Sequence, residues 1–217
     1  MAYSPSTRTV QDVIKNVQRS FGDESGVQLT NSDIFMWVND ACDEIVKRNR
    51  INKAKATIPS VAGQADYSFS ALNIMQVEAI HFGGQRIPNM SFAEAEEQVI
   101  GRDGVTTQAG IPMLWYEWAG TFTFYPVPNA SGTDIVVYYT GQPTKVTATT
   151  DLLPLSDKYY NDIVNFVLLK AYEMDEDPQM SQLKGQQFDA SLAAMGEEER
   201  EAQNMTYPTI TVLDFGG

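Results

Sequence analysis

The chain has 217 residues, 43% of them hydrophobic, with 28 acidic against 15 basic side chains and a formal net charge of -13. This length suits one large or two modest domains. There is no run of about 18 apolar residues that would cross a bilayer, and the start "MAYSPSTRTV" lacks the regions of a signal peptide. We therefore expect a soluble chain of cytoplasmic origin, without membrane contact and poorly suited to gripping nucleic acid nonspecifically.

The residues that usually carry chemistry are scarce. Cys42 and His81 are the only cysteine and histidine, which excludes an intrachain disulfide and a multi-thiolate zinc site. The sequence contains no Gly-rich phosphate loop, no G-x-S-x-G and no H-E-x-x-H. We expect no catalytic residues, no cofactor and no metal, with Cys42 and His81 as packed residues.

Two helical patterns precede residue 53. A capping-box-like start at Thr9 predicts a helix that ends at Gly22. A second helix starts at Thr30 or Asn31, and we expect the two helices to form an antiparallel pair. Apolar residues at helical spacing mark their buried sides: Val10, Val13, Ile14, Val17 and Phe21 in the first, and Ile34, Trp37, Val38, Ala41 and Ile45 in the second.

Residues 53–152 change to strand patterns. Short segments rich in β-branched and aromatic residues are separated by Gly, Pro, Asn or Ser. Gly83-Gly84 and Ala119-Gly120 predict hairpin turns, and "SFAEAEEQVIGR" predicts a short helix. The aromatic residues are expected to fill a core or an interface. The predicted strand segments are "KATIP", "ADYSFS", "IMQVEAIHF", "LWYEWA", "TFTFYPVP" and "DIVVYYT".

Helical periodicity returns at Ser156. Asp177-Pro178 predicts the end of one helix and the start of the next, whose apolar side fades over "GEEEREAQN". The predicted buried residues are Tyr160, Ile163, Val164, Val167, Ala171 and Met174 in the third helix and Leu183, Phe188, Leu192 and Met195 in the fourth. The expected fold class is α+β: a four-helix bundle formed by the N- and C-terminal helical hairpins (1–52 and 153–203), an inserted β-rich segment (53–152) and an extended C-terminal arm (204–217).

Charge is uneven along the chain. Residues 151–217 contain 13 acidic against 4 basic residues, whereas the segment "KRNRINKAK" is basic. Two interpretations of this segment stay open: cations that favour a helix C-terminus, or a patch that meets phosphate or an acidic surface. A head-to-tail contact between copies would join it to the acidic last third. The candidate interface residues are Lys47, Arg48, Arg50, Lys53 and Lys55.

The C-terminal stretch "NMTYPTITVLDFGG" alternates like a strand but has no visible partner nearby. We interpret it as a docking arm that adds a strand to an exposed edge of a partner; the alternative is that it pairs with the chain's own β segment. Its candidate contact residues are Tyr207, Pro208, Thr209, Ile210, Thr211, Val212, Leu213 and Phe215.

Four motifs in a fixed order span nearly the whole chain. They are "TVQDVIKNVQRSFGDESG"; "SDIFMWVNDACDEIVKRN" with its Trp-x-Asn-x-Ala core; "FTFYPVPNASGTDIVVYYTGQP" with strand, Tyr-Pro-x-Pro, turn and strand; and "LPLSDKYYNDIVNFVLLKAYEMDEDPQ". This order resembles the head-to-tail adaptor (connector) proteins of tailed bacteriophages. The resemblance implies a structural virion protein rather than an enzyme, made in the host cytoplasm and placed at the neck as a dodecameric ring.

The resemblance also implies the partners. These are the portal protein above, a tail or nozzle protein below, and double-stranded DNA that passes through the lumen without sequence-specific binding. The charge of -13 predicts a lumen wall that is acidic or neutral. Two alternatives remain: another phage neck or tail-completion protein, and a carboxylate-dependent hydrolase that uses Glu117 and Asp134.

Overall fold

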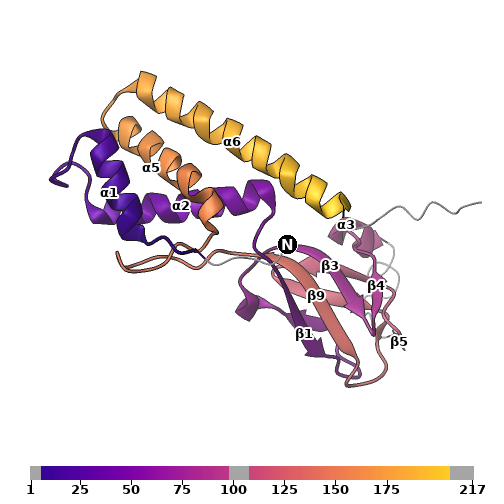
Figure 1. Cartoon of the computed structure of the whole chain (residues 1–217). Coiled ribbons are helices and arrows are strands. Elements are labelled where there is room, and N and C mark those ends of the chain that lie inside the picture. The colour runs from indigo at the N-terminus through magenta and orange to yellow at the C-terminus, as the bar shows by residue number, and fades with distance from the viewer. Residues whose placement is uncertain (1–5, 98–107, 206–217) are drawn as a thin grey trace, which may run out of the picture. The chain divides into compact units, whose positions relative to one another are not determined.

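The computed structural model describes residues 6–97 and 108–205, with side chains up to residue 201. The chain divides into two compact units, residues 1–51 with 143–217 and residues 52–142, which we name the helical unit and the sheet unit. Figure 1 shows the elements of both. The expected α+β class is confirmed: N- and C-terminal helices pack together, and a β-sheet region is inserted between them in the sequence.

Four helices form the helical unit: α1 (Val10–Phe21), α2 (Asn31–Asn49), α5 (Tyr160–Met174) and α6 (Pro178–Met205). Helix α5, preceded by the 3-10 turn η3 (Asp157–Tyr159), packs against the other three. Figure 1 shows α6 running beside α5. Helix α1 packs mainly on α5 rather than on α2, so the expected α1–α2 pair is not the dominant contact.

Local signals explain where these helices begin and end. Thr9 and Asp12 form a reciprocal capping box at α1, and Gly22 takes the left-handed conformation (φ 92°) that ends it. The Thr30 hydroxyl accepts from the backbone N–H of Asp33 at the start of α2. The Asp177 carboxylate accepts from the first backbone N–H groups of α6, directly before Pro178.

The last helix differs from the sequence prediction. Helix α6 continues through the acidic run 196–204 to Met205, so the first two residues of the predicted arm are helical. Glu, Ala, Gln and Met are strong helix formers, and an exposed helix end needs no apolar side to persist. The rest of the predicted arm, residues 206–217, lies outside the described residues.

Two predicted core residues are also wrong. Met174 and Leu183 are 48% and 44% exposed, because both lie near the turn that joins α5 to α6. Leu168 and Asp162 are buried in α5 instead.

The described residues of the sheet unit form three sheets, with all six predicted segments contributing strands. Its additional elements are η1 (Ser70–Leu72) and α3 (Phe92–Ala95). A four-stranded antiparallel sheet has the order β1 (Lys53–Pro59), β9 (Asp134–Gly141), β3 (Ile74–Phe82) and β4 (Gln85–Ile87). A three-stranded sheet has the order β2 (Asp66–Ser68), β7 (Thr121–Tyr125) and β6 (Leu114–Trp118), and β5 (Ala109–Gly110) pairs in parallel with β8 (Val127–Pro128).

The predicted hairpin turns are confirmed. Gly83 and Gly84, both at positive φ, join β3 to β4, and Ala119 and Gly120, also at positive φ, join β6 to β7. Positive φ at both central residues gives the turn the twist that its flanking strands require.

One core lies between the four-stranded and three-stranded sheets. Alternate residues of β3 and β9, three aliphatic and two aromatic, supply one side, and aromatic residues of the smaller sheet supply the other. Phe69 meets Phe122 with ring centroids 4.7 Å apart, edge to face. The residues of opposite parity in the four-stranded sheet point away from this core and form its outer face.

Candidate partner-binding site

Arg48, in the last turn of α2, is committed to contacts within the helical unit. Its Nε donates to Glu44 Oε1 at 2.6 Å, and its Nη1 donates to Asp189 Oδ1 on α6. Its guanidinium carbon lies 5.5 Å from the centre of the Phe188 ring. Hydrogen bonds to Glu44 and then Asp189 raise the pKa of Arg48. This predicted interface residue therefore ties α2 to α6.

The other residues of the basic segment divide between the two units. Lys47 and Arg50 are exposed at the C-terminal end of α2, where a cation is favoured by the helix dipole. Lys53 and Lys55 are exposed on β1. Within the described residues, none of these four forms an ion pair. The predicted arm contacts, 207–215, lie outside the part of the chain that the structure describes.

Strand pairing places Lys53 and Lys55 on the outer face of the four-stranded sheet. Directly opposite residues in antiparallel strands share a face, so the register gives three rows across it. The rows are Lys53, Thr140 and Gln76; Lys55, Tyr138 and Ala79; and Thr57, Val136, His81 and Arg86. The His81 and Tyr138 rings lie 5.0 Å apart.

Arg86 belongs to this face, and sequence reasoning missed it. It stands alone in the sequence between Gln85 and Ile87, outside any basic run. The available signal was its alternation within β4, because Ile87 points to the core and Arg86 must then point outward. Its neighbours on the face come from β3, β9 and β1, and this strand order was not evident from the sequence.

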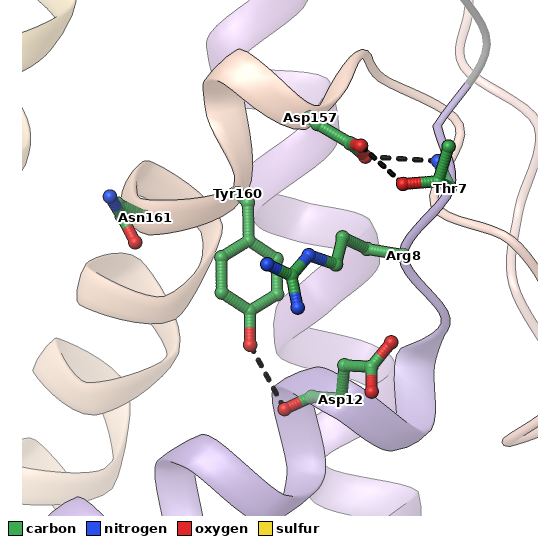
Figure 2. A pocket seen from close by; sticks show the side chains of 6 residues that line it. All are labelled: Thr7, Arg8, Asp12, Asp157, Tyr160 and Asn161. Carbon is green, nitrogen blue, oxygen red and sulfur yellow. Dashed lines mark hydrogen bonds between the residues drawn. The ribbon is translucent and has the colours of Figure 1, made fainter.

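An open, polar cavity of about 460 Å³ lies where the N-terminal segment meets α5. Figure 2 shows Asp157 directed at Thr7, while the Arg8 guanidinium lies against the Tyr160 ring, 5.0 Å from its centre. The Tyr160 hydroxyl donates to the backbone carbonyl of Asp12 at 3.0 Å. The residues that line this cavity are Thr7, Arg8, Asp12, Asp157, Tyr160 and Asn161.

Asp157 holds the N-terminal segment in place. Its carboxylate accepts from the Ser6 hydroxyl at 2.7 Å, the Thr7 backbone N–H at 3.0 Å and the Thr7 hydroxyl at 2.5 Å. The Thr7 and then the Ser6 hydroxyl hydrogen bonds lower the pKa of Asp157 to about 2. Because the carboxylate is occupied by these hydrogen bonds, we interpret the cavity as the place where Asp157 fixes residues 6 and 7 to the helical unit.

A second polar group is buried without such support. Asp162 on α5 has no exposed surface, and neither of its carboxylate oxygens has a hydrogen-bond partner among the described residues. Burial raises the pKa of Asp162, and Ser191 on α6 only partly opposes the shift. The Tyr159 hydroxyl, three residues earlier, is likewise buried without a hydrogen-bond partner in the described part of the chain, and burial raises its pKa.

The described residues offer little to the hydrolase alternative. Cys42 is buried, and burial first, then Asp43, raises the pKa of its thiol to about 12, which opposes thiolate formation. Glu117 on β6 and Asp134 on β9 belong to different sheets. Within residues 6–97 and 108–201, no group of three or more His, Cys, Asp or Glu side chains is placed to hold a metal ion.

None of the described helices has the length and apolar character needed to cross a membrane. Comparison with known protein families gives a match to the family model of the SU10 adaptor protein over residues 8–212. The match includes both units. No curated protein matches the chain.

Proposed function

The chain belongs to the SU10 adaptor protein family, and on that premise we propose that its copies form a head-to-tail adaptor ring in the virion. The match confirms the resemblance to phage adaptors that the order of sequence motifs indicates. As a member of this family the chain has a structural role. The proposal adds the ring, the portal above, a tail or nozzle protein below, and DNA in the lumen.

The observation that carries the proposal is the family match over nearly the whole chain. Charge supports the ring, because the helical unit contains 20 acidic against 11 basic residues, while exposed cations stand on β1 of the sheet unit. Contacts between unlike surfaces of identical copies are heterologous, and such contacts form a ring where the rotation from copy to copy closes. An acidic lumen wall would let DNA pass without sticking.

The test is electron microscopy of purified virions or reconstituted portal complexes. We expect density for this chain as a closed ring between portal and tail. A ring elsewhere in the neck or tail would make it a tail-completion protein instead, and an isolated monomer in assembled particles would contradict the ring. A continuous Lys and Arg stripe along the channel wall would contradict the acidic lumen.

We also propose that the residues after α6 dock on the portal or on a neighbouring subunit. Support comes from the strand-like alternation of 209–213 and from the exposed Glu197 and Glu198 on the preceding helix. Deleting residues 205–217 should leave the melting temperature of the isolated chain nearly unchanged but abolish its attachment. A deletion that unfolds the chain, or that assembles as well as the full chain, would contradict docking.

A further inference from the structure

We propose that the outer face of the four-stranded sheet receives the acidic end of α6 from a second copy of the chain. This inference rests on the proposed ring and names the surfaces that join its copies. The proposed binding surface is thus a face built from four strands, rather than the continuous basic segment "KRNRINKAK" of the sequence.

The first observation is the placement of cations. The sheet unit contains eight acidic and four basic residues. Three of the four bases, Lys53, Lys55 and Arg86, stand on the outer face, and the fourth, Arg102, lies outside the described residues. All three are exposed, and none has an ion pair in the described part of the chain. Unpaired cations on an acidic protein are available to a partner.

The spacing of these cations suits a partner of helical width. Lys53 and Lys55 lie on the edge strand β1, and Arg86 lies on the opposite edge strand β4. Three strand spacings separate these edges, about 14 Å. The face also has two acids: Glu78, which accepts from the Thr140 hydroxyl at 2.9 Å, and the exposed Asp134 at the end of β9.

The centre of the face distinguishes a protein partner from nucleic acid. Between the charged edges lie Tyr138, 39% exposed, the half-buried Val136 and Ala79, and the His81 ring against Tyr138. An apolar and aromatic centre with a charged rim is the anatomy of a protein interface. A phosphate backbone would instead be held by Lys and Arg along its path, and β3 and β9 contain neither. The face therefore fits a partner with carboxylates around an aliphatic surface.

The chain itself offers exposed carboxylates at the end of α6. Glu197, Glu198 and Glu201 are exposed, lie on one side of the helix by their spacing, and have no ion pair among the described residues. Glu199 differs, because it pairs with Lys158 in the helical unit. The sheet face and the α6 end are different surfaces, so their contact between copies is heterologous, as a ring requires.

The test uses matched pairs of charge reversals in the full chain. K55E/R86E reverses one cation at each edge of the sheet, E197K/E198K reverses the helix end, and K15E/R19E reverses two exposed cations of α1 as the control. The number of copies incorporated per particle is measured by quantitative mass spectrometry. We expect each of the first two variants to lose at least about tenfold in incorporation, because like charges face each other, with the control unchanged.

Co-expression of the two defective variants decides whether the contact joins different copies. A reversed sheet face then meets a reversed helix end on its neighbour, so alternating copies should restore incorporation. Contact within one chain would leave the mixture defective, although combining all four substitutions in one chain would rescue it. Thermal melting of each purified variant checks that the substitutions leave its folding intact.

Three results would overturn the inference: wild-type incorporation of K55E/R86E, failure of the mixture, or a loss of incorporation in the control equal to that of K55E/R86E. If K55E/R86E loses duplex DNA binding in a mobility-shift assay and the mixture does not restore incorporation, the sheet face binds the phosphate backbone of DNA instead of a second copy. Wild-type particles without this chain would overturn the proposed ring instead. Sedimentation velocity of the purified chain, with and without K55E/R86E, then decides the contact by self-association.

Discussion

The helical unit and the sheet unit use their charged side chains differently. Every ion pair of the described residues lies in the helical unit, where Arg48, Lys145, Lys158 and Lys170 pair with acids of the same unit. The sheet unit leaves its described cations exposed and unpaired, and builds its core from aliphatic and aromatic side chains. Ion pairs thus support the tertiary structure of the helical unit, whereas the exposed cations of the sheet unit remain available for contact with a partner.

The largest effects should come from the two separate cores. Phe124 in the sheet unit and Ile163 in the helical unit have no exposed surface. We expect Phe124→Ala to cost about 3–5 kcal/mol and Ile163→Ala about 2–5 kcal/mol in the free energy of unfolding, because each leaves a cavity. Differential scanning calorimetry should show each substitution lowering the transition of its own unit. Equal loss in both transitions would contradict independent cores.

Asp162 should give the next largest effect, as the one acid of α5 that the helical unit buries without a pair. Its raised pKa means that protonation stabilises the folded state; this stability is present below 3.8, the ordinary pKa of an aspartate, and is lost as pH rises through the folded pKa. We expect Asp162→Asn to gain about 1 kcal/mol at pH 8 and to flatten this dependence. Urea unfolding across pH measures both; a destabilised Asn variant would contradict the unpaired state.

Asp157 should show the opposite pH dependence. Its pKa is lowered to about 2, so its hydrogen bonds stabilise the folded state above pH 3.8, and this contribution is lost as pH falls through 2. The protection factor of the Thr7 amide, which is its exchange rate relative to the intrinsic rate at the same pH, should therefore fall as pH approaches 2 and should already be low at neutral pH in Asp157→Ala. A Thr7 protection factor that is the same at acidic pH and in Asp157→Ala as in the original chain at neutral pH would contradict the anchoring role of this carboxylate.

The smallest effects on stability should come from one arginine of each unit: Arg48, which is paired, and Arg86, which has no ion pair among the described residues. Arg48→Ala should cost up to about 1 kcal/mol, less in high salt, because its ion pairs are partly exposed. Arg86→Ala should stay within about 0.5 kcal/mol of the original chain, because an exposed, unpaired side chain contributes little to folding. Urea unfolding at low and high salt compares them. A larger, salt-sensitive loss at Arg86 would place it in a structural ion pair.

The fold was predictable wherever one local signal decides the structure. The Thr9 capping box, the Gly22 end of α1, the Gly83-Gly84 turn and the Asp177-Pro178 junction act over a few residues, and each was read correctly. The end of α6 was not predictable in this way. Residues 197–201 are charged and mostly exposed, so only their helix propensity, and no apolar periodicity, indicates that the helix continues.

The candidate surface was only half predictable for a different reason. Lys53 and Lys55 lie in a basic run that the sequence shows directly, whereas Arg86 shares their sheet face only through the order β1-β9-β3-β4. That order pairs residues separated widely in the chain, which alternation within a single strand does not specify. Arg48 was assigned to the same patch because sequence proximity does not reveal that Asp189, far along the chain, already binds it.

The length of α6 has a mechanical consequence. Its 28 residues form a helix of about 42 Å, so the direction in which the exposed side chains Glu197 and Glu198 point depends on the rotation of the helix about its axis. One inserted residue in its exposed half would turn everything beyond it by about 100°, whereas seven would nearly restore the angle while advancing it by about 10 Å. The rotational phase of α6, more than its length, therefore determines which way its acidic end faces.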